Sequence, residues 1–111
     1  MANTFKNSIT SSIGTSGVKV YETPAGTAAT VIGVNVANTS TQNISVSVML
    51  RDNGGNKCVF LVKNALIVQG SSNVMVGGDQ KVVLEATDFI SVTSSLAASA
   101  DVIVSVLELT Q

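Results

Sequence analysis

The side chains that most often carry out catalysis are sparse in this sequence. It contains no histidine, so the commonest general base and the commonest metal ligand are both absent. Ser-His-Asp triads, Cys-His pairs and histidine-based zinc sites are therefore excluded. Most of the seven carboxylates are expected at strand ends or in turns, where Asp caps backbone amides, and not facing each other across a hydrolytic cleft. The seven are Glu22, Asp52, Asp79, Glu85, Asp88, Asp101 and Glu108.

Oxygen-rich stretches offer two weak metal motifs. Glu85–Asp88 and the group of Asp52, Asn53 and Asn56 could each be imagined as a calcium cage, but neither has the charge density of a dedicated calcium loop. The glycine-rich stretch Gly77–Lys81 superficially suggests a phosphate-binding loop, yet no helix follows whose amino terminus could meet an anion. We interpret it as a hairpin turn, and we expect no metal and no other cofactor.

The remaining reactive and basic side chains also predict no chemistry. Cys58 is the single cysteine and lies in an apolar run, so the sequence predicts a buried, inert thiol. Lys57, Lys63 and Lys81 lack interleaved aromatic residues on which bases could stack, and they are expected to be solvated, some of them protecting sheet edges. With 6 basic and 7 acidic residues, the chain favours neither nucleic acid nor a membrane surface electrostatically.

Composition predicts one β-rich domain. Only 12% of the residues are charged, and polarity comes from 14 Ser, 11 Thr and 9 Asn set against 18 Val and 7 Ile. Such β-branched residues favour a half-buried pleated surface. Because the only aromatic residues are Phe5, Tyr21, Phe60 and Phe89, the core must be aliphatic and thin, as between two packed sheets. The length of 111 residues fits a single domain.

Alternating apolar and polar residues, interrupted by turns, predict eight or so strands and no convincing helix. Ile44–Arg51 has the clearest period of two, and the Asn-Gly-Gly sequence after it favours a tight hairpin. These features predict an all-β fold, an antiparallel two-layer β-sandwich with jelly-roll or Greek-key-like connections. The expected strands are 17–22, 29–37, 44–51, 57–63, 65–68, 73–76, 81–85, 89–93 and 101–109.

The first 17 residues are polar and contain Phe5, Ile9 and Ile13 at intervals of four. That spacing fits one face of either a helix or a strand, but the intervening serines, threonines and glycines are poor helix formers. We therefore predict an extended N-terminal arm or edge strand over 1–17, followed by a β-sandwich domain over 18–111. The start of the chain lacks the apolar core of a signal peptide, so synthesis in a cytosol is expected.

The stretches Thr30–Ser40, Gly77–Ala86 and Ser105–Glu108 resemble small virion structural proteins of tailed phages, notably cyanophages. The resemblance implies a β-rich component of the particle, in particular a capsid decoration or cement protein. Such proteins are often trimers and use an N-terminal arm to reach neighbouring subunits. By this resemblance Phe5, Ile9 and Ile13 would be apolar anchors for the major capsid protein or another virion subunit.

Three other classes of function remain open at this point. A ring component of the neck, tail or baseplate would use a sandwich of the same size. A small carbohydrate- or surface-binding module is disfavoured because sugar platforms need exposed aromatic rings, and the chain has one Tyr and no Trp. An enzyme is the weakest alternative, for want of a nucleophile paired with a base. We therefore expect a non-enzymatic, homo-oligomeric virion subunit that contacts neither nucleic acid nor membrane.

Overall fold

The computed structural model describes residues 2–54, 56–76 and 81–110, and these residues form strands, turns and loops without a helix. In that part of the chain no helical segment has the length and apolarity of a membrane crossing. The strands are β1 (Ala2–Ile13), β2 (Val18–Glu22), β3 (Thr27–Asn38), β4 (Ile44–Asp52), β5 (Lys57–Ile67), β6 (Ser72–Val76), β7 (Val82–Leu84), β8 (Phe89–Ser94) and β9 (Ala100–Thr110).

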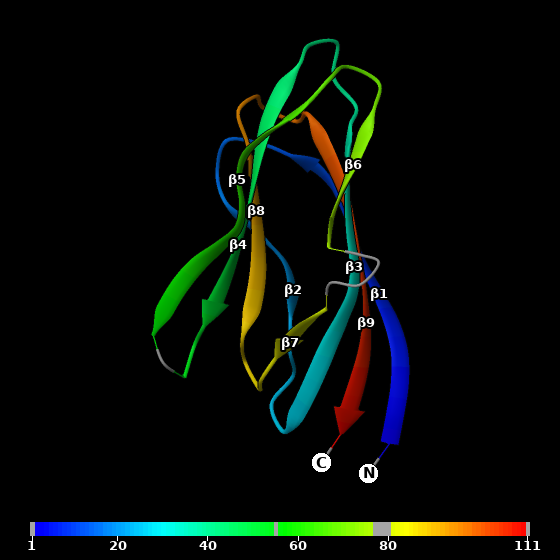
Figure 1. The fold of residues 1–111 in the computed structure, drawn as a ribbon, viewed down its shortest axis with the longest axis vertical. Coiled ribbons are helices and arrows are strands. Elements are labelled where there is room, and N and C mark those ends of the chain that lie inside the picture. The colour runs from blue at the N-terminus through cyan, green and yellow to red at the C-terminus, as the bar shows by residue number, and fades with distance from the viewer. Residues whose placement is uncertain (1, 55, 77–80, 111) are drawn as a thin grey trace.

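The strands form two antiparallel sheets that pack face to face (Figure 1). Sheet A has the order β1-β9-β3-β6, with β7 also paired to β3, and sheet B has the order β2-β8-β4-β5. The last strand lies beside the first in sheet A, and the second last lies beside the second in sheet B. This wrapping of paired strands is the jelly-roll arrangement, so the predicted sandwich is confirmed and its connectivity is resolved.

The core lies between the sheets and is built from aliphatic side chains on one face of each strand. Along β9, Val102, Val104 and Val106 point inward and are at most 2% exposed, and Val34 and Val48 from β3 and β4 are fully buried. Each such side chain contributes roughly 1.5–3 kcal/mol by leaving water. No aromatic ring belongs to this fully buried set in the described residues, which agrees with the thin aliphatic core that the composition predicts.

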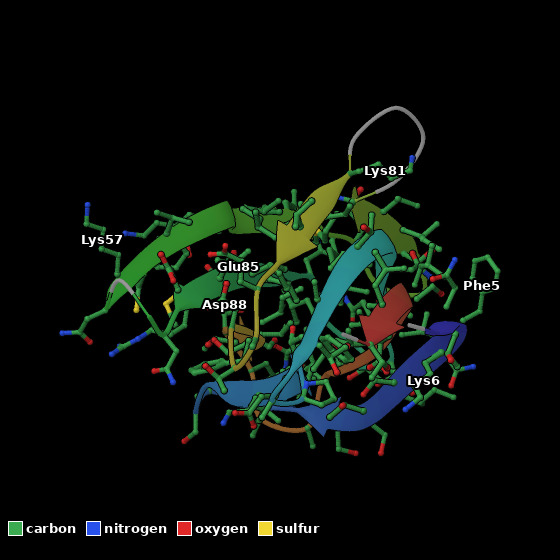
Figure 2. The ribbon with its side chains drawn as sticks, turned by 90° about the horizontal axis from the view of Figure 1, so that it is seen from below. Phe5, Lys6, Lys57, Lys81, Glu85 and Asp88 are labelled. Atoms are coloured by element: carbon green, nitrogen blue, oxygen red, sulfur yellow. The ribbon has the colours of Figure 1, made fainter. Side chains whose placement is uncertain are left out.

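β5 differs from the sequence-based expectation in length and in burial. It is one strand from Lys57 to Ile67, not two, and it is the outer strand of sheet B. Its first four residues are exposed on both faces, because there the β4–β5 hairpin extends past the opposite sheet (Figure 2). The prediction of a buried Cys58 thiol is therefore wrong, since the side chain is exposed. The predicted turn at Gly77–Asp79 lies outside the described residues.

The N-terminal segment adopts the edge-strand alternative, because β1 pairs with β9 along nearly its whole length. Near its end, Ser11 and Ser12 together face the single residue Asp101, which makes a β-bulge. Ser12 has a φ of 58°, and its backbone N–H donates to Asp101 Oδ1 at 3.0 Å. The extra residue reverses the alternation of the strand at this point.

This bulge separates the three apolar residues that were expected to act together. Phe5 and Ile9 point outward and are 76% and 71% exposed, whereas Ile13 is fully buried in the core. The prediction of Ile13 as a partner-binding anchor is therefore wrong, because a side chain without exposed surface contributes packing and not contact with another molecule. Before the bulge the inward side chains, including Lys6 and Ser8, are polar.

We predict that Ser12→Val lowers the free energy of unfolding by about 1 kcal/mol or more, because β-branched side chains are strained at positive φ. Ser12→Gly is the matched control, since glycine adopts this φ freely, and it should stay within about 0.5 kcal/mol of the wild type. Urea unfolding followed by circular dichroism measures both. Equal stability of the two variants would contradict the bulge.

Candidate assembly surfaces

The outer face of sheet A carries two rows of side chains, each of which crosses β1, β9, β3 and either β6 or β7. The strand registers place the members of each row opposite one another, so they share one face. The first row is Phe5, Leu107, Thr30 and Val83. The second row is Ile9, Ile103, Asn35 and Val74. Between them lies a neutral row of Asn7, Ser105 and Gly33.

Five apolar side chains in these rows are uncovered, and we call them the sheet A surface: Phe5, Ile9, Val74, Val83 and Ile103. Their exposed fractions run from 38% at Ile103 to 76% at Phe5. Figure 2 shows Phe5 pointing away from the sandwich. Together they expose on the order of 500 Å² of apolar surface.

The sheet A surface is almost free of charge. Among the described residues that the register places on this outer face, the one ionisable side chain is Asp101, at the start of β9. Its carboxylate already accepts the Ser12 N–H. A partner with a strongly charged surface would lose hydration here without gaining a counter-charge. The surface therefore suits a neutral, apolar partner.

Two shallow hollows lie beside the protruding side chains of β1. One, of about 270 Å³, lies between Phe5 and Ile32, with Ser105 in its lining. The other, of about 160 Å³, lies beside Ile9 and Ile103. The same face thus offers projections and recesses of side-chain size, which is the relief that two packed sheets need in order to interdigitate.

A second uncovered surface lies on sheet B. Phe60 and Leu66 on β5 are 51% and 65% exposed, and the register places them opposite outward residues of β4. Lys63 Nζ lies 5.1 Å from the centroid of the Phe60 ring, and Arg51 contacts the Cys58 sulfur at 3.4 Å. We call Phe60, Leu66, Cys58 and Lys63 the β5 surface. It is apolar with basic flanks, so it differs in chemistry from the sheet A surface.

The open edge between β1 and β2 is closed by polar contacts. Ser8 Oγ donates to the Val20 carbonyl at 2.6 Å, and the Tyr21 hydroxyl donates to Glu108 Oε2 at 2.6 Å. The other oxygen of Glu108 lies 3.2 Å from Lys6 Nζ. Burial first, and then the hydrogen bond and charge of Glu108, raise the pKa of Tyr21 well above its usual value. These contacts pair the charges of Lys6 and Glu108 with each other and give Ser8 and Tyr21 hydrogen-bond partners, so they stabilise this side of the fold.

The carboxylates that the sequence placed in two weak calcium motifs come together at one end of the sandwich. Oxygen atoms of Asp52, Glu85 and Asp88 lie within 4.8 Å of one another. Both oxygens of Asp88, which is 4% exposed, already accept backbone N–H groups, from Asn53 at 3.1 Å and from Glu85 at 3.0 Å. In this geometry Asp88 joins two loops, and three neighbouring carboxylates alone do not define a metal site.

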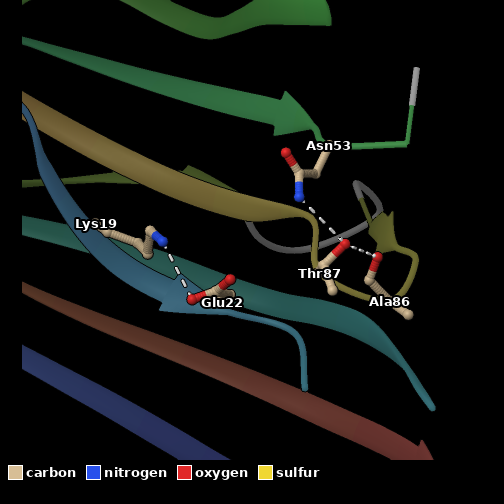
Figure 3. Close-up of polar contacts among 5 residues, drawn as sticks. All are labelled: Lys19, Glu22, Asn53, Ala86 and Thr87. Carbon is tan, nitrogen blue, oxygen red and sulfur yellow. Dashed lines mark hydrogen bonds and ion pairs between the residues drawn. The ribbon is translucent and has the colours of Figure 1, made fainter. Parts of the chain in front are cut away.

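The same two loops are joined by a side-chain contact. Asn53 Nδ2 donates to Thr87 Oγ1 at 3.4 Å, as Figure 3 shows beside the separate Lys19–Glu22 pair on β2. Two other carboxylates have similar local roles. Asp101 accepts a hydrogen bond from the Ser12 N–H at the bulge, and Glu108 accepts one from the Tyr21 hydroxyl. Glu22, Asp88, Asp101 and Glu108 thus stabilise turns and edges.

Comparisons with known proteins support the fold. No protein-family model matches the chain, and no curated protein has a significantly similar sequence. Over 98% of its length the chain is similar to a chain of the T13 particle of infectious bursal disease virus (IBDV), with 14% identity and a TM-score of 0.60. It covers 31% of that viral chain, and 36% of the VP2 chain of an IBDV subviral particle (12% identity, TM-score 0.51).

A chain of the Bacillus endospore appendages, described as disulfide-linked pili, is similar over 97% of this chain and 88% of its own length. The identity is 14% and the TM-score is 0.58. This chain therefore spans about a third of the viral chains and most of the pilus chain. At these identities the likeness shows a shared jelly-roll fold.

We predict that the single tyrosine does not ionise near its usual pKa of 10.0 while the protein is folded. Because the pKa of Tyr21 is raised in the folded state, the neutral hydroxyl stabilises the fold fully at any pH below the usual pKa. This stability is lost as the pH rises from the usual pKa through the folded-state pKa. Phenolate absorbance should therefore appear together with unfolding. Tyr21→Phe should show a smaller alkaline loss of stability. A phenolate signal near pH 10 in folded protein would contradict the prediction.

We predict that Asp88→Ala lowers the free energy of unfolding by about 2 kcal/mol, because two backbone N–H groups lose their acceptor. Glu85→Gln is the control, since it removes a charge from the same cluster without removing those bonds. Urea unfolding measures both variants. If Asp88→Ala and Glu85→Gln had the same free energy of unfolding, the hydrogen bonds that Asp88 accepts would not account for the effect.

Proposed function

We propose that this protein is a non-enzymatic structural subunit of a virion, and more narrowly a capsid decoration or cement protein of a tailed phage. It binds the assembled shell without covalent bonds and stabilises it by adding binding free energy to the assembled state alone. The chain is made in the host cytosol and resides in the particle. It needs no cofactor.

One observation carries this proposal: large apolar side chains are left uncovered on both sheets. The sheet A surface and the β5 surface lie on the two outer faces of the sandwich. A protein that joins neighbours must bury surface on at least two of them, and a two-layer sandwich with an apolar patch on each outer face has that form. Two of the three phenylalanines, Phe5 and Phe60, lie on these surfaces.

Three further points support the proposal. Polarity outside the patches comes from short neutral side chains, which lose little entropy when a partner covers them. The jelly-roll fold is shared with chains of viral particles. The resemblance to phage decoration proteins adds the major capsid protein as a partner and homo-oligomerisation, with a trimer as the form typical of such proteins.

A ring component of a neck, tail or baseplate is the second candidate. β1 and β5 are long outer strands of their sheets, and a closed ring needs two separate contact surfaces on every subunit. The solution mass separates the candidates, since a six-fold or larger ring would favour the neck or tail.

We predict that the purified protein binds undecorated shells of its virion and raises the temperature at which they release their contents. Phe60→Ser with Leu66→Ser should weaken shell binding at least tenfold, because both side chains lie on the β5 surface. Co-sedimentation measures binding, and unfolding curves establish that the variant is folded.

The exposed thiol supplies an independent readout. Cys58 lies on β5 and is the single cysteine, so a maleimide should label the free protein without denaturant. Bound shells should slow that labelling. Undiminished shell binding by the double variant, together with unchanged labelling, would exclude the β5 surface as the shell contact. A protein that binds no shell under any condition would contradict the decoration role.

A further inference from the structure

We infer that the sheet A surface binds a second copy of this chain, face to face, about a two-fold axis. The inference deepens the proposed function by assigning one of its two surfaces to self-association. The β5 surface then remains for the shell. Three features of the sheet A surface support this occupant over any other.

The first feature is its area. A standard interface buries roughly 800 Å² on each partner, and roughly two thirds of a homodimer interface is apolar. The five uncovered side chains of the sheet A surface expose on the order of 500 Å², which matches that apolar share. The surrounding small and neutral residues, such as Asn7 and Ser105, supply the polar remainder.

The second feature is its charge. Two-fold packing sets a surface against itself, so any charge near the axis would meet its own copy. Among the described outward residues of sheet A, Asp101 is the one ionisable member, and it lies at the start of β9, beside the smaller hollow and away from Asn7. The β5 surface fails the same test, because it contains Lys63 and Lys57 lies at the start of the same strand. Two β5 edges paired antiparallel about Phe60 would set Lys57 directly opposite Lys63.

The third feature is its relief. Phe5 and Ile9 project from β1, and hollows of about 270 Å³ and 160 Å³ lie beside them on the same face. Isologous packing requires projection and recess on one surface, so that each copy fills the other. A two-fold axis that crosses β1 near Asn7 would set Phe5 of each copy against Ile9 of the other, with the hollows beside both side chains.

The pattern of β1 agrees with such a partner. Its inward side chains before the bulge, such as Lys6 and Ser8, are polar, while its large apolar side chains point to solvent. A lone sandwich would gain more from the opposite arrangement. The Ser12 bulge keeps the strand in this orientation while returning Ile13 to the core. The strand thus gives its apolar side to an external layer.

The test is the solution mass of the full chain by multi-angle light scattering, without any shell. We expect an even number of copies, and we expect Phe5→Ser with Ile9→Ser to halve the mass. A two-fold contact can coexist with a three-fold one, so either a dimer falling to a monomer or a hexamer falling to a trimer supports the inference. Asn7→Arg, which places like charges near the axis, should also halve the mass.

Phe60→Ser with Leu66→Ser is the matched control and should keep the wild-type mass. A wild-type monomer or trimer at every concentration, or a mass that the β1 double variant leaves unchanged, would overturn the inference. If the double variant unfolds, Asn7→Arg alone decides, since Asn7 is exposed. A wild-type protein that forms the dimer but binds no shell would count against the proposed function alone. A wild-type protein that is a monomer and still binds shells would count against this inference alone.

Discussion

The structure depends on one constraint, which is that a thin aliphatic core between two sheets uses only one face of every strand. Val and Ile fill that space in a single layer from each side, as Val34, Val48 and Val104 do. The side chains on the other face of each strand do not contribute to this core. The apolar side chains found there, Phe5 and Phe60 above all, therefore need an explanation outside the stability of the single chain.

Much of the fold follows from the sequence because period-two alternation is a local signal. The clear alternation of Ile44–Arg51 gives β4 almost to the residue, and the largely apolar run over 101–109 gives β9. The jelly-roll order does not follow in the same way, since pairing β1 with β9 joins residues that are nearly the whole chain apart. Long-range pairing leaves no mark on local composition.

The assembly surfaces were predicted less completely, for identifiable physical reasons. A spacing of four puts Phe5, Ile9 and Ile13 on one face of a regular strand, and nothing in the Ser-Ser sequence announces the bulge that moves Ile13 to the core. Cys58 was expected to be buried because its neighbours are apolar, but an outer strand that extends past its partner sheet exposes both faces. One available signal was Ile103, an apolar residue at an outward position of a strand whose inward positions are already apolar.

The placement of aromatic residues also bears on how stability and assembly are balanced. Burying a phenylalanine ring would strengthen a core that otherwise contains small aliphatic side chains, yet Phe5 and Phe60 are left more than half exposed. In a monomer that arrangement forgoes stability and invites aggregation. In a lattice it does the reverse, because the same rings leave water only when neighbours are correctly placed, so the assembled state and not the free subunit receives the stabilisation. Charge would separate the two proposed contacts: the neutral sheet A surface would tolerate its own copy, while the lysines of β5 would oppose self-pairing and leave that edge for a different partner.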